Sequence, residues 1–273
     1  MNELFLLISP SAYGFIFACA GLSAYCVSRF FVFRFGTAIA RPFSFDIVFL
    51  LLVVAGGIGG RALFILYNLS YFFENPSEIP AIWHGGWVWH GALIGGALGL
   101  FFYSQAKKIS FLLFADLLAP GVVLAQSIGR WGNYFNQELY GLPANAWWAI
   151  PISEENRVAG FEAYTYFHPT FLYESLWDFG LFVLLFVAVR KMYRQRDRMS
   201  QVIFTLEGTQ SSGTIFALYL ILYSLGRFFI EFFRIDSVPV FIIFRLPQWF
   251  SVVFVLIGAY ILLRGLQRRK KVV

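Results

Sequence analysis

The sequence predicts an all-α, polytopic membrane protein that forms a single helical domain over residues 1–273. Hydrophobic residues make up 59% of the chain and charged residues only 13%. The mean hydropathy is +0.69, which is outside the range of soluble globular proteins. Because a hydrocarbon core of roughly 30 Å needs about 20 apolar residues in a helix, the apolar runs predict seven transmembrane helices, at residues 11–28, 45–67, 86–103, 111–129, 170–189, 214–233 and 247–264.

The basic residues predict how these helices are oriented. Most of the 21 Lys and Arg follow the first, third, fifth and last apolar runs, in segments 29–41, 107–108, 190–198 and 264–271. Residues 1–12 and the loop 68–85 contain none. Positively charged loops stay in the cytoplasm. We therefore expect the N-terminus outside, the C-terminus in the cytoplasm, and an outer-side loop region at about residues 130–169.

Glycines in the second and third predicted helices indicate close helix packing. Gly91, Gly95 and Gly99 recur every four residues, and Gly56 and Gly60 repeat the spacing in the second helix. Small residues at this interval let two helix backbones approach each other. We interpret these glycines as packing residues.

The third helix is expected to begin before Gly91, because the 13 residues from Gly91 to Tyr103 are too few to cross a bilayer. Its first turn then carries His90 at the membrane edge. A lone histidine is often a hydrogen-bonded structural residue, but beside arginines an imidazole is a plausible general base. Asp116 and Asp178 lie deeper in their helices, and we assign them only helix-to-helix hydrogen bonding.

Composition excludes several other classes of protein. The net charge is +6 and the isoelectric point about 9.4, yet the basic residues form short juxtamembrane clusters, which orient helices and meet anionic lipid rather than nucleic acid. Cys19 and Cys26 form no disulfide or metal pattern. Phosphate-binding loops, dinucleotide fingerprints and metal-ligand spacings do not occur. We expect no cofactor and no metal.

Six arginines depart from the positive-inside pattern because they lie near or beyond the outer ends of the predicted helices. They are Arg61, Arg130, Arg157, Arg227, Arg234 and Arg245. The carboxylates of Glu138 and Glu231 are expected on the same side. An outward surplus of guanidinium groups at several helix ends predicts a site for an anion in the outer leaflet.

Residues 129–141 contain the densest group of polar residues next to an apolar run. Arg130, Asn133, Asn136 and Glu138 follow the fourth predicted helix directly. An arginine at the bilayer centre costs roughly 2.5 to 3.5 kcal/mol on insertion scales, so ionisable residues near membrane depth are candidates for function.

The sixth predicted helix carries a polar stripe. Tyr219, Tyr223, Arg227 and Glu231 recur at intervals of four and share one helical face. An Arg227–Glu231 pair that only neutralises two charges is one interpretation. Because two tyrosines continue the stripe, we favour a polar groove.

Read together, these motifs resemble the prolipoprotein diacylglyceryl transferases, bacterial enzymes that lipidate lipoprotein precursors. The resemblance covers most of the chain, and its most specific part is the 129–141 stretch. The motifs that carry it are Gly60-Arg61, Tyr67-Asn68, Gly85-Gly86, His90-Gly91, Leu93–Gly96, Gly129–Gly141, His168-Pro169, Leu172–Glu174, Gly226–Phe228 and Glu231–Arg234.

The resemblance implies transfer of a diacylglyceryl group from phosphatidylglycerol to the lipobox cysteine of a prolipoprotein signal peptide, with release of glycerol phosphate. It implies a multi-pass protein of the bacterial cytoplasmic (inner) membrane, surrounded by membrane lipid, with its active site facing the outer leaflet. A polytopic transporter and a lipid-binding membrane protein remain the alternatives, although ionisable residues that gather at one face argue against a translocation path.

The resemblance also implies roles for individual residues. We expect Arg130 and Arg227 to stabilise the leaving phosphate, Glu138 and Glu231 to orient these guanidinium groups, and His90 to act as the base. Asn133 and Asn136 are expected to hydrogen-bond glycerol hydroxyls. The further substrate-binding positions are Tyr13, Arg61, Gly141 and Tyr223.

Overall fold

The computed structural model describes residues 2–35, 42–199, 213–236 and 238–270, with the side chains of 2–13, 42–44, 89–90, 193–199 and 268–270 outside the description. The described chain is helical, with two short two-stranded sheets. The α-helices are α1 (Asn2–Phe35), α2 (Pro42–Tyr67), α3 (Leu69–Glu74), α4 (Trp89–Lys107), α5 (Phe111–Phe135), α6 (Thr170–Met199), α7 (Thr214–Ile230) and α8 (Leu246–Lys270). The 3₁₀ helices are η1 (Pro76–Glu78), η2 (Ile82–His84), η3 (Glu154–Asn156) and η4 (Glu231–Phe233), and the strands are β1 (Ile150–Pro151), β2 (Tyr166–Phe167), β3 (Val240–Phe241) and β4 (Phe244–Arg245).

The prediction of a helical, polytopic membrane protein is confirmed. In the described part of the chain, six helical segments are long and apolar enough to cross a membrane: Gly14–Phe35, Phe45–Tyr67, Phe111–Phe135, Thr170–Met192, Thr214–Phe233 and Leu246–Gln267. Each of the seven predicted runs lies largely within a helix, but α4 is not among these six segments. The count of seven transmembrane helices and the outside-to-inside orientation therefore stay predictions.

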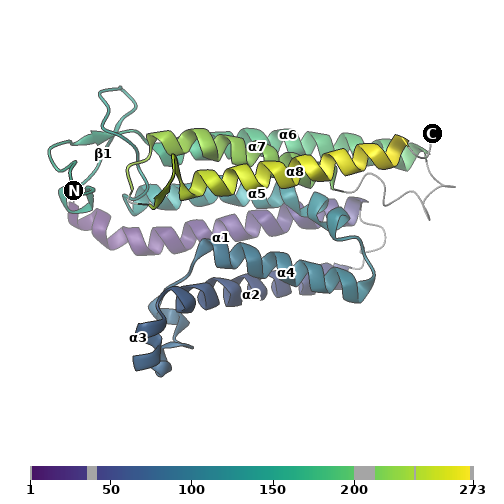
Figure 1. The fold of residues 1–273 in the computed structure, drawn as a ribbon, viewed down its shortest axis with the longest axis horizontal. Coiled ribbons are helices and arrows are strands. Elements are labelled where there is room, and N and C mark those ends of the chain that lie inside the picture. The colour runs from purple at the N-terminus through teal and green to yellow at the C-terminus, as the bar shows by residue number, and fades with distance from the viewer. Residues whose placement is uncertain (1, 36–41, 200–212, 237, 271–273) are drawn as a thin grey trace. The chain divides into compact units, whose positions relative to one another are not determined.

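The helices form two compact units, one made of residues 1–31 and 115–273 and the other of residues 32–114. A single domain over residues 1–273 stays a prediction. In the larger unit, the start of α1 and strand β1 lie at one end of the helices, and α8 ends at the other (Figure 1). We call the first of these ends the outer end, in keeping with the predicted orientation.

The smaller unit is held together by α2 and α4, and the predicted glycine packing is confirmed. A Cβ atom added to Gly91 would lie 2.3 Å from the carbonyl oxygen of Gly59, and one added to Gly95 would lie 2.2 Å from that of Ala55. The contact at Gly56, which was also predicted to be a packing residue, is less close, because a Cβ atom added there would lie 3.3 Å from the carbonyl oxygen of Ala92. The closest backbone approach on α2 is therefore at Ala55 and Gly59.

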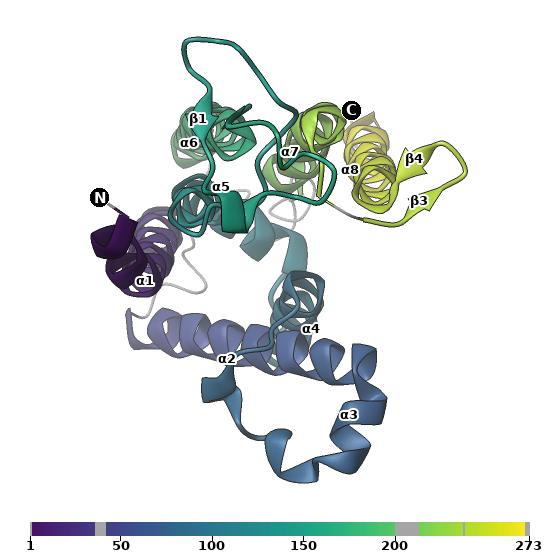
Figure 2. The same cartoon turned by 90° about the vertical axis from the view of Figure 1, so that its left-hand side faces the viewer.

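In the larger unit, α7 packs against both α6 and α8 (Figure 2). The approach to α6 is closest at Gly226, where an added Cβ would lie 2.2 Å from the indole Nε1 of Trp177. That Nε1 donates a hydrogen bond of 3.0 Å to the carbonyl of Leu222. The absence of a side chain at Gly226 thus brings α6 and α7 together one residue before Arg227.

Asp116 has a definite structural role that the sequence left open. It is fully buried on α5, and its two carboxylate oxygens accept the backbone N–H groups of Gly213, at 2.7 Å, and Phe216, at 2.8 Å. These groups begin α7, and Gly213 has no side chain with which to cap them. A carboxylate there pairs exposed donors and complements the positive end of the helix dipole.

The outer-side segment between α5 and α6 has a small hydrophobic core of its own. Tyr140, Ile152 and Phe167 are buried together, and β1 pairs antiparallel with β2. The Tyr140 hydroxyl donates to Asn156 O and accepts from the backbone N–H of Val158, both at 2.7 Å. The predicted loop region is therefore a folded cap at the outer end of the unit.

Two glycines of α4 provide a matched test of helix packing. Gly95→Ala is expected to lower the free energy of unfolding by about 1 to 3 kcal/mol, because the new methyl group overlaps the backbone of α2. Gly96→Ala is the control, since nothing lies within 4 Å of its added Cβ. Thermal unfolding in detergent measures both variants, and equal melting temperatures would contradict the packing role of Gly95.

Replacement of Asp116 tests the cap on α7. Asp116→Ala is expected to destabilise the protein by about 2 kcal/mol, because two backbone N–H groups at the start of α7 lose their acceptor. Asp116→Asn keeps one acceptor oxygen and should lose less. The same unfolding measurement decides, and an alanine variant as stable as the parent would exclude the cap as a source of stability.

Candidate functional site

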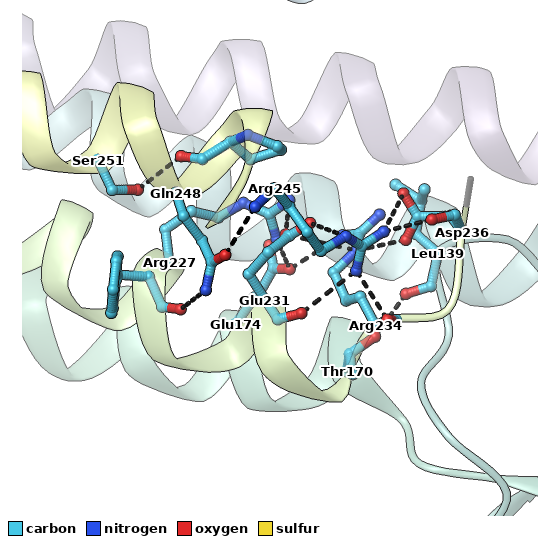
Figure 3. Close-up of polar contacts among 12 residues, drawn as sticks. Leu139, Thr170, Glu174, Arg227, Glu231, Arg234, Asp236, Arg245, Gln248 and Ser251 are labelled. Atoms are coloured by element: carbon cyan, nitrogen blue, oxygen red, sulfur yellow. Dashed lines mark hydrogen bonds and ion pairs between the residues drawn. The ribbon is translucent and has the colours of Figure 1, made fainter. Parts of the chain in front are cut away.

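Glu174 lies at the centre of a cluster of charged residues at the outer end of the larger unit (Figure 3). It stands in the first turns of α6, which begins at Thr170 after Pro169, and it is only 4% exposed. Its carboxylate pairs with the Nε of Arg130 at 2.7 Å, with Nη1 of Arg227, and with Nη1 of Arg234 at 3.2 Å. One carboxylate thus joins guanidinium groups from α5, from α7 and from the segment after η4.

Glu231 forms a second centre beside the first. Its side chain is buried, and it pairs with Nη2 of Arg227 at 2.7 Å, with Nε of Arg245 at 3.2 Å and with Nε of Arg234 at 3.8 Å. Arg227 therefore bridges the two carboxylates. The pair Arg227–Glu231 occurs as the spacing predicted, but as part of a network rather than alone.

Asp236 completes the charged cluster between α7 and α8. Its Oδ1 accepts from Nε of Arg234 at 2.7 Å, and its backbone carbonyl accepts from Arg245. Burial alone would raise the pKa of the Asp236 carboxyl, but the Arg234 hydrogen bond and the charges of Arg234 and Arg245 hold it below its usual range. The carboxylate is therefore ionised at neutral pH.

The cluster carries a net positive charge when all its members are ionised. Four guanidinium groups face three carboxylates: Arg130, Arg227, Arg234 and Arg245 against Glu174, Glu231 and Asp236. Buried charges of one sign are costly unless they are paired. A fourth carboxyl group, that of Asp178, also interacts with Arg130, and the anion site stays a prediction.

The polar stripe of α7 faces α5 and α6. The Nη2 of Arg130 donates to the Tyr223 hydroxyl at 3.5 Å, and the Tyr219 hydroxyl donates to Oε1 of Gln126 at 3.2 Å. The two tyrosine rings are stacked, with centroids 5.6 Å apart. Together with the pairing of Arg227 and Glu174, these contacts form a continuous polar surface inside the helical bundle.

Glu138 has different partners from those the sequence analysis assigned. Its Oε1 accepts hydrogen bonds from the amides of Asn133, at 2.9 Å, and Asn136, at 3.2 Å. Among the described contacts of Glu138 there is no guanidinium group, and the carboxylate that pairs with both Arg130 and Arg227 is that of Glu174. Gln137 and Leu139, on either side of Glu138, have positive φ angles of 51° and 57°. Such strained backbone conformations cluster at functional sites.

Gly141 lies where three segments cross. An added Cβ would lie 2.7 Å from the carbonyl of Phe233 and 2.8 Å from Cγ2 of Thr170. The backbone N–H of Gly141 donates to His168 O at 2.8 Å, and Gly141 pairs with Arg234 in an isolated β-bridge. These contacts indicate a packing role that joins the 129–141 stretch to the arginine cluster, while substrate contact at Gly141 stays a prediction.

Arg61 belongs to the smaller unit, where its guanidinium group organises a loop. It donates to the backbone carbonyls of Glu78 and Gly85 at 2.5 Å each, of Ile79 and Gly86 at 3.2 Å each, and of Ala81 at 3.4 Å. All three of its nitrogens are thus engaged with backbone oxygens. The described contacts give Arg61 a structural function, and substrate binding by Arg61 stays a prediction.

Two predicted site residues have side chains outside the described part of the structure. The backbone of Tyr13 lies in α1, and that of His90 lies in the first turn of α4. The expectation that this helix begins before Gly91 is confirmed by its start at Trp89. The catalytic role of His90 and the substrate role of Tyr13 stay predictions.

Glu174 was not predicted as a site residue, although it lies in the Leu172–Glu174 motif and pairs with three arginines, as many as Glu231 does. A signal was available, because arginines predicted at buried helix ends require carboxylates at the same depth, and Glu174 lies near the outer start of its helix. Arg234 and Arg245 were recognised as unusually placed arginines, but not as members of the cluster.

Comparison with known proteins agrees with the resemblance. A family model described as prolipoprotein diacylglyceryl transferase matches residues 4–264. A protein from Fervidobacterium nodosum is 43% identical over 208 residues, which cover 76% of this chain and 65% of that relative. Proteins from Trichormus variabilis and Synechocystis are 37% and 36% identical, over 82% and 90% of this chain and 75% and 82% of the relatives.

All three relatives are named phosphatidylglycerol–prolipoprotein diacylglyceryl transferase. The matched region contains every residue of the charged cluster, and it includes the strained turn that presents Glu138. The predicted family and enzyme class are therefore confirmed, and this chain belongs to the prolipoprotein diacylglyceryl transferase family.

Proposed function

We propose that this chain transfers the diacylglyceryl group of phosphatidylglycerol to the thiol of a lipobox cysteine in a prolipoprotein signal peptide. The reaction takes place at the outer leaflet of the bacterial cytoplasmic membrane. The observation that supports this most directly is the pairing of Arg130 and Arg227 with one buried carboxylate, Glu174. This pairing gathers two guanidinium groups from different helices where a lipid phosphate would lie.

The chemistry requires stabilisation of a phosphate leaving group. The cysteine sulfur attacks the glyceryl carbon that carries the phosphate, so that a carbon–sulfur bond forms as the carbon–oxygen bond breaks. The electron pair of the broken bond remains on the phosphate oxygen of glycerol phosphate, and the thiol proton passes to a base. Guanidinium groups fixed in a low-dielectric site stabilise such developing charge.

Exposure and hydrogen bonding favour Arg130 and Arg227 as the phosphate ligands. Their side chains are 21% and 16% exposed, whereas that of Arg234 is only 3% exposed. Arg245 is also 16% exposed, but all three of its nitrogens engage carboxylate or backbone oxygens. Arg234 and Arg245 therefore support the site, while Arg130 and Arg227 can face the lipid.

The polar residues of the 129–141 stretch fit the glycerol part of the head group. Asn133 and Asn136 are held by Glu138 at the outer end of α5. Amide groups there can donate to and accept from hydroxyl groups. Glu138 then orients amides rather than guanidinium groups.

A transporter is less well supported than a transferase. A translocation path needs ionisable residues distributed through the membrane. Asp116, one of two acidic residues predicted deep in the helices, accepts hydrogen bonds from the backbone N–H groups of Gly213 and Phe216 at the start of α7. The ion pairs of Glu174, Glu231 and Asp236 with arginine concentrate at the outer end of the larger unit.

Arg130→Lys tests the phosphate clamp. We expect kcat/KM to fall roughly 100- to 1000-fold, because a lysine is a point charge that cannot pair with Glu174 and a phosphate in one plane. The rate of diacylglyceryl addition to a lipobox peptide, followed by mass spectrometry with phosphatidylglycerol as donor, measures the loss. Arg157→Lys, in the outer-side segment but outside the cluster, is the control. Activity of Arg130→Lys equal to that of the control would exclude the clamp.

His90→Ala tests the predicted base. If the imidazole accepts the thiol proton, kcat should fall by about 100- to 10000-fold, with loss of the acidic limb of the pH profile. His84→Ala is the control, because His84 is exposed and its Nδ1 pairs with Glu78 at 2.7 Å. Near-normal turnover of His90→Ala, combined with an inactive Arg130→Ala, would mean that the imidazole is not the base while the clamp remains.

A further inference from the structure

A second polar layer lies about one helical turn farther from the outer end than the arginine cluster. Gln126 precedes Arg130 by four residues on α5, and Asp178 follows Glu174 by four residues on α6. Four residues of helix correspond to about 6 Å. We call this the inner layer, and its members are Gln126, Asp178, Tyr219 and Tyr223.

The inner layer is connected to the cluster above it. Tyr219 donates to Gln126 at 3.2 Å, and Tyr223 accepts from Arg130 at 3.5 Å. Asp178 interacts electrostatically with Arg130 and with both tyrosines. The polar surface therefore extends from the outer end into the helical bundle.

Two buried atoms of the inner layer lack a hydrogen-bond partner within the described residues. They are Nε2 of Gln126 and Oδ2 of Asp178, on side chains whose residues are 8% and 2% exposed. An unpaired buried polar group is destabilising, and such groups are rare in native proteins. One atom is a donor and the other an acceptor, so the layer is complementary to a ligand that offers both.

A peptide backbone offers both kinds of group. Within a membrane every backbone N–H and C=O must find a partner, so an acceptor segment that is extended at its cysteine needs donors and acceptors from the enzyme. The ester carbonyls of a glycerolipid, by contrast, only accept hydrogen bonds and leave Oδ2 of Asp178 unsatisfied. The inner layer therefore fits a polypeptide better than it fits the lipid.

The direction in which the thiol displaces the phosphate also favours a position of the acceptor segment beside the inner layer. A nucleophile displaces a leaving group from the opposite side of the carbon atom. If the phosphate binds to Arg130 and Arg227 and the bond to its glyceryl carbon points along the helices into the bundle, the face of that carbon open to attack is the one toward the inner layer. The segment that carries the thiol then lies beside Gln126 and Asp178.

We propose that Gln126 and Asp178 form a subsite for the backbone next to the reacting cysteine of the acceptor polypeptide. Nε2 of Gln126 donates to a backbone carbonyl, and Oδ2 of Asp178 accepts from a backbone N–H. The subsite recognises the extended backbone rather than a side chain. This assignment rests on the proposed function and adds to it the position of the acceptor substrate.

The two substrates respond differently to changes in the inner layer. Asp178→Asn and Gln126→Met are expected to raise KM for a lipobox peptide roughly 10-fold, while KM for phosphatidylglycerol changes less than twofold. Asp116→Asn is the matched control, because Asp116 is the other deep aspartate and is engaged in capping α7. A rise in KM for phosphatidylglycerol alone would assign the layer to the lipid and overturn the proposal. A fall in kcat at unchanged KM values for both substrates would also overturn it.

Backbone-modified peptides identify the contact directly. Replacing the amide bonds at the cysteine and its two neighbours, one at a time, by ester bonds removes one N–H in each peptide. One of these peptides should lose about 10-fold in kcat/KM with the parent enzyme, and less than twofold with Asp178→Asn. Equal losses with both enzymes, or no loss with the parent at any position, would overturn the proposal. If the Asp178→Asn enzyme aggregates, the test rests on the series of ester-containing peptides measured with the parent enzyme.

Direct binding separates this proposal from the proposed function. The dissociation constant of the same peptides for the detergent-solubilised protein can be measured without phosphatidylglycerol. Absence of lipidated product from the parent enzyme would contradict the transferase reaction. Loss of peptide affinity in Gln126→Met would still support the subsite, and unchanged affinity would overturn it.

Discussion

The charged cluster depends on the shared carboxylate of Glu174. Three guanidinium groups converge on it, from α5, from α7 and from the segment after η4, so a single side chain sets their mutual distances. Removing one partner from a buried ion pair typically costs about 3 to 5 kcal/mol, because the other charge remains buried and unpaired. Glu174 therefore couples the stability of the outer end of the bundle to the geometry of the proposed phosphate site.

Close backbone approach makes that convergence possible. Gly226 brings α7 against Trp177 of α6 immediately before Arg227. Gly141 lets the end of the 129–141 stretch pair with Arg234 in an isolated β-bridge. A site that stabilises developing charge works best when its donors are already oriented. These two glycines allow the neighbouring segments to hold the arginines in place.

The helices and the character of the site could be predicted, because both depend on local properties of the chain. Apolar runs predicted the membrane helices, and arginines that violate the positive-inside pattern predicted an anion site at the outer end. The partners of these arginines could not be predicted as reliably. Glu138 was expected to orient the guanidinium groups of Arg130 and Arg227, but it lies between two residues with positive φ and accepts hydrogen bonds from two asparagine amides. Arg61 fitted the same charge pattern and instead holds a loop of the smaller unit.

The sequence alone determined that this chain is a helical membrane protein, which family it resembles, and which arginines depart from the positive-inside pattern. These properties follow from transfer free energies and from motifs that act within one or two helical turns. Only the tertiary structure decided that Glu174 pairs with three arginines and that Asp116 caps α7. It also showed that Gln126 and Asp178 each have a buried atom with no hydrogen-bond partner among the residues that the structure describes. Such partnerships join residues about 40 to 100 positions apart, and they depend on the rotation and packing of whole helices, which hydrophobic periodicity does not specify.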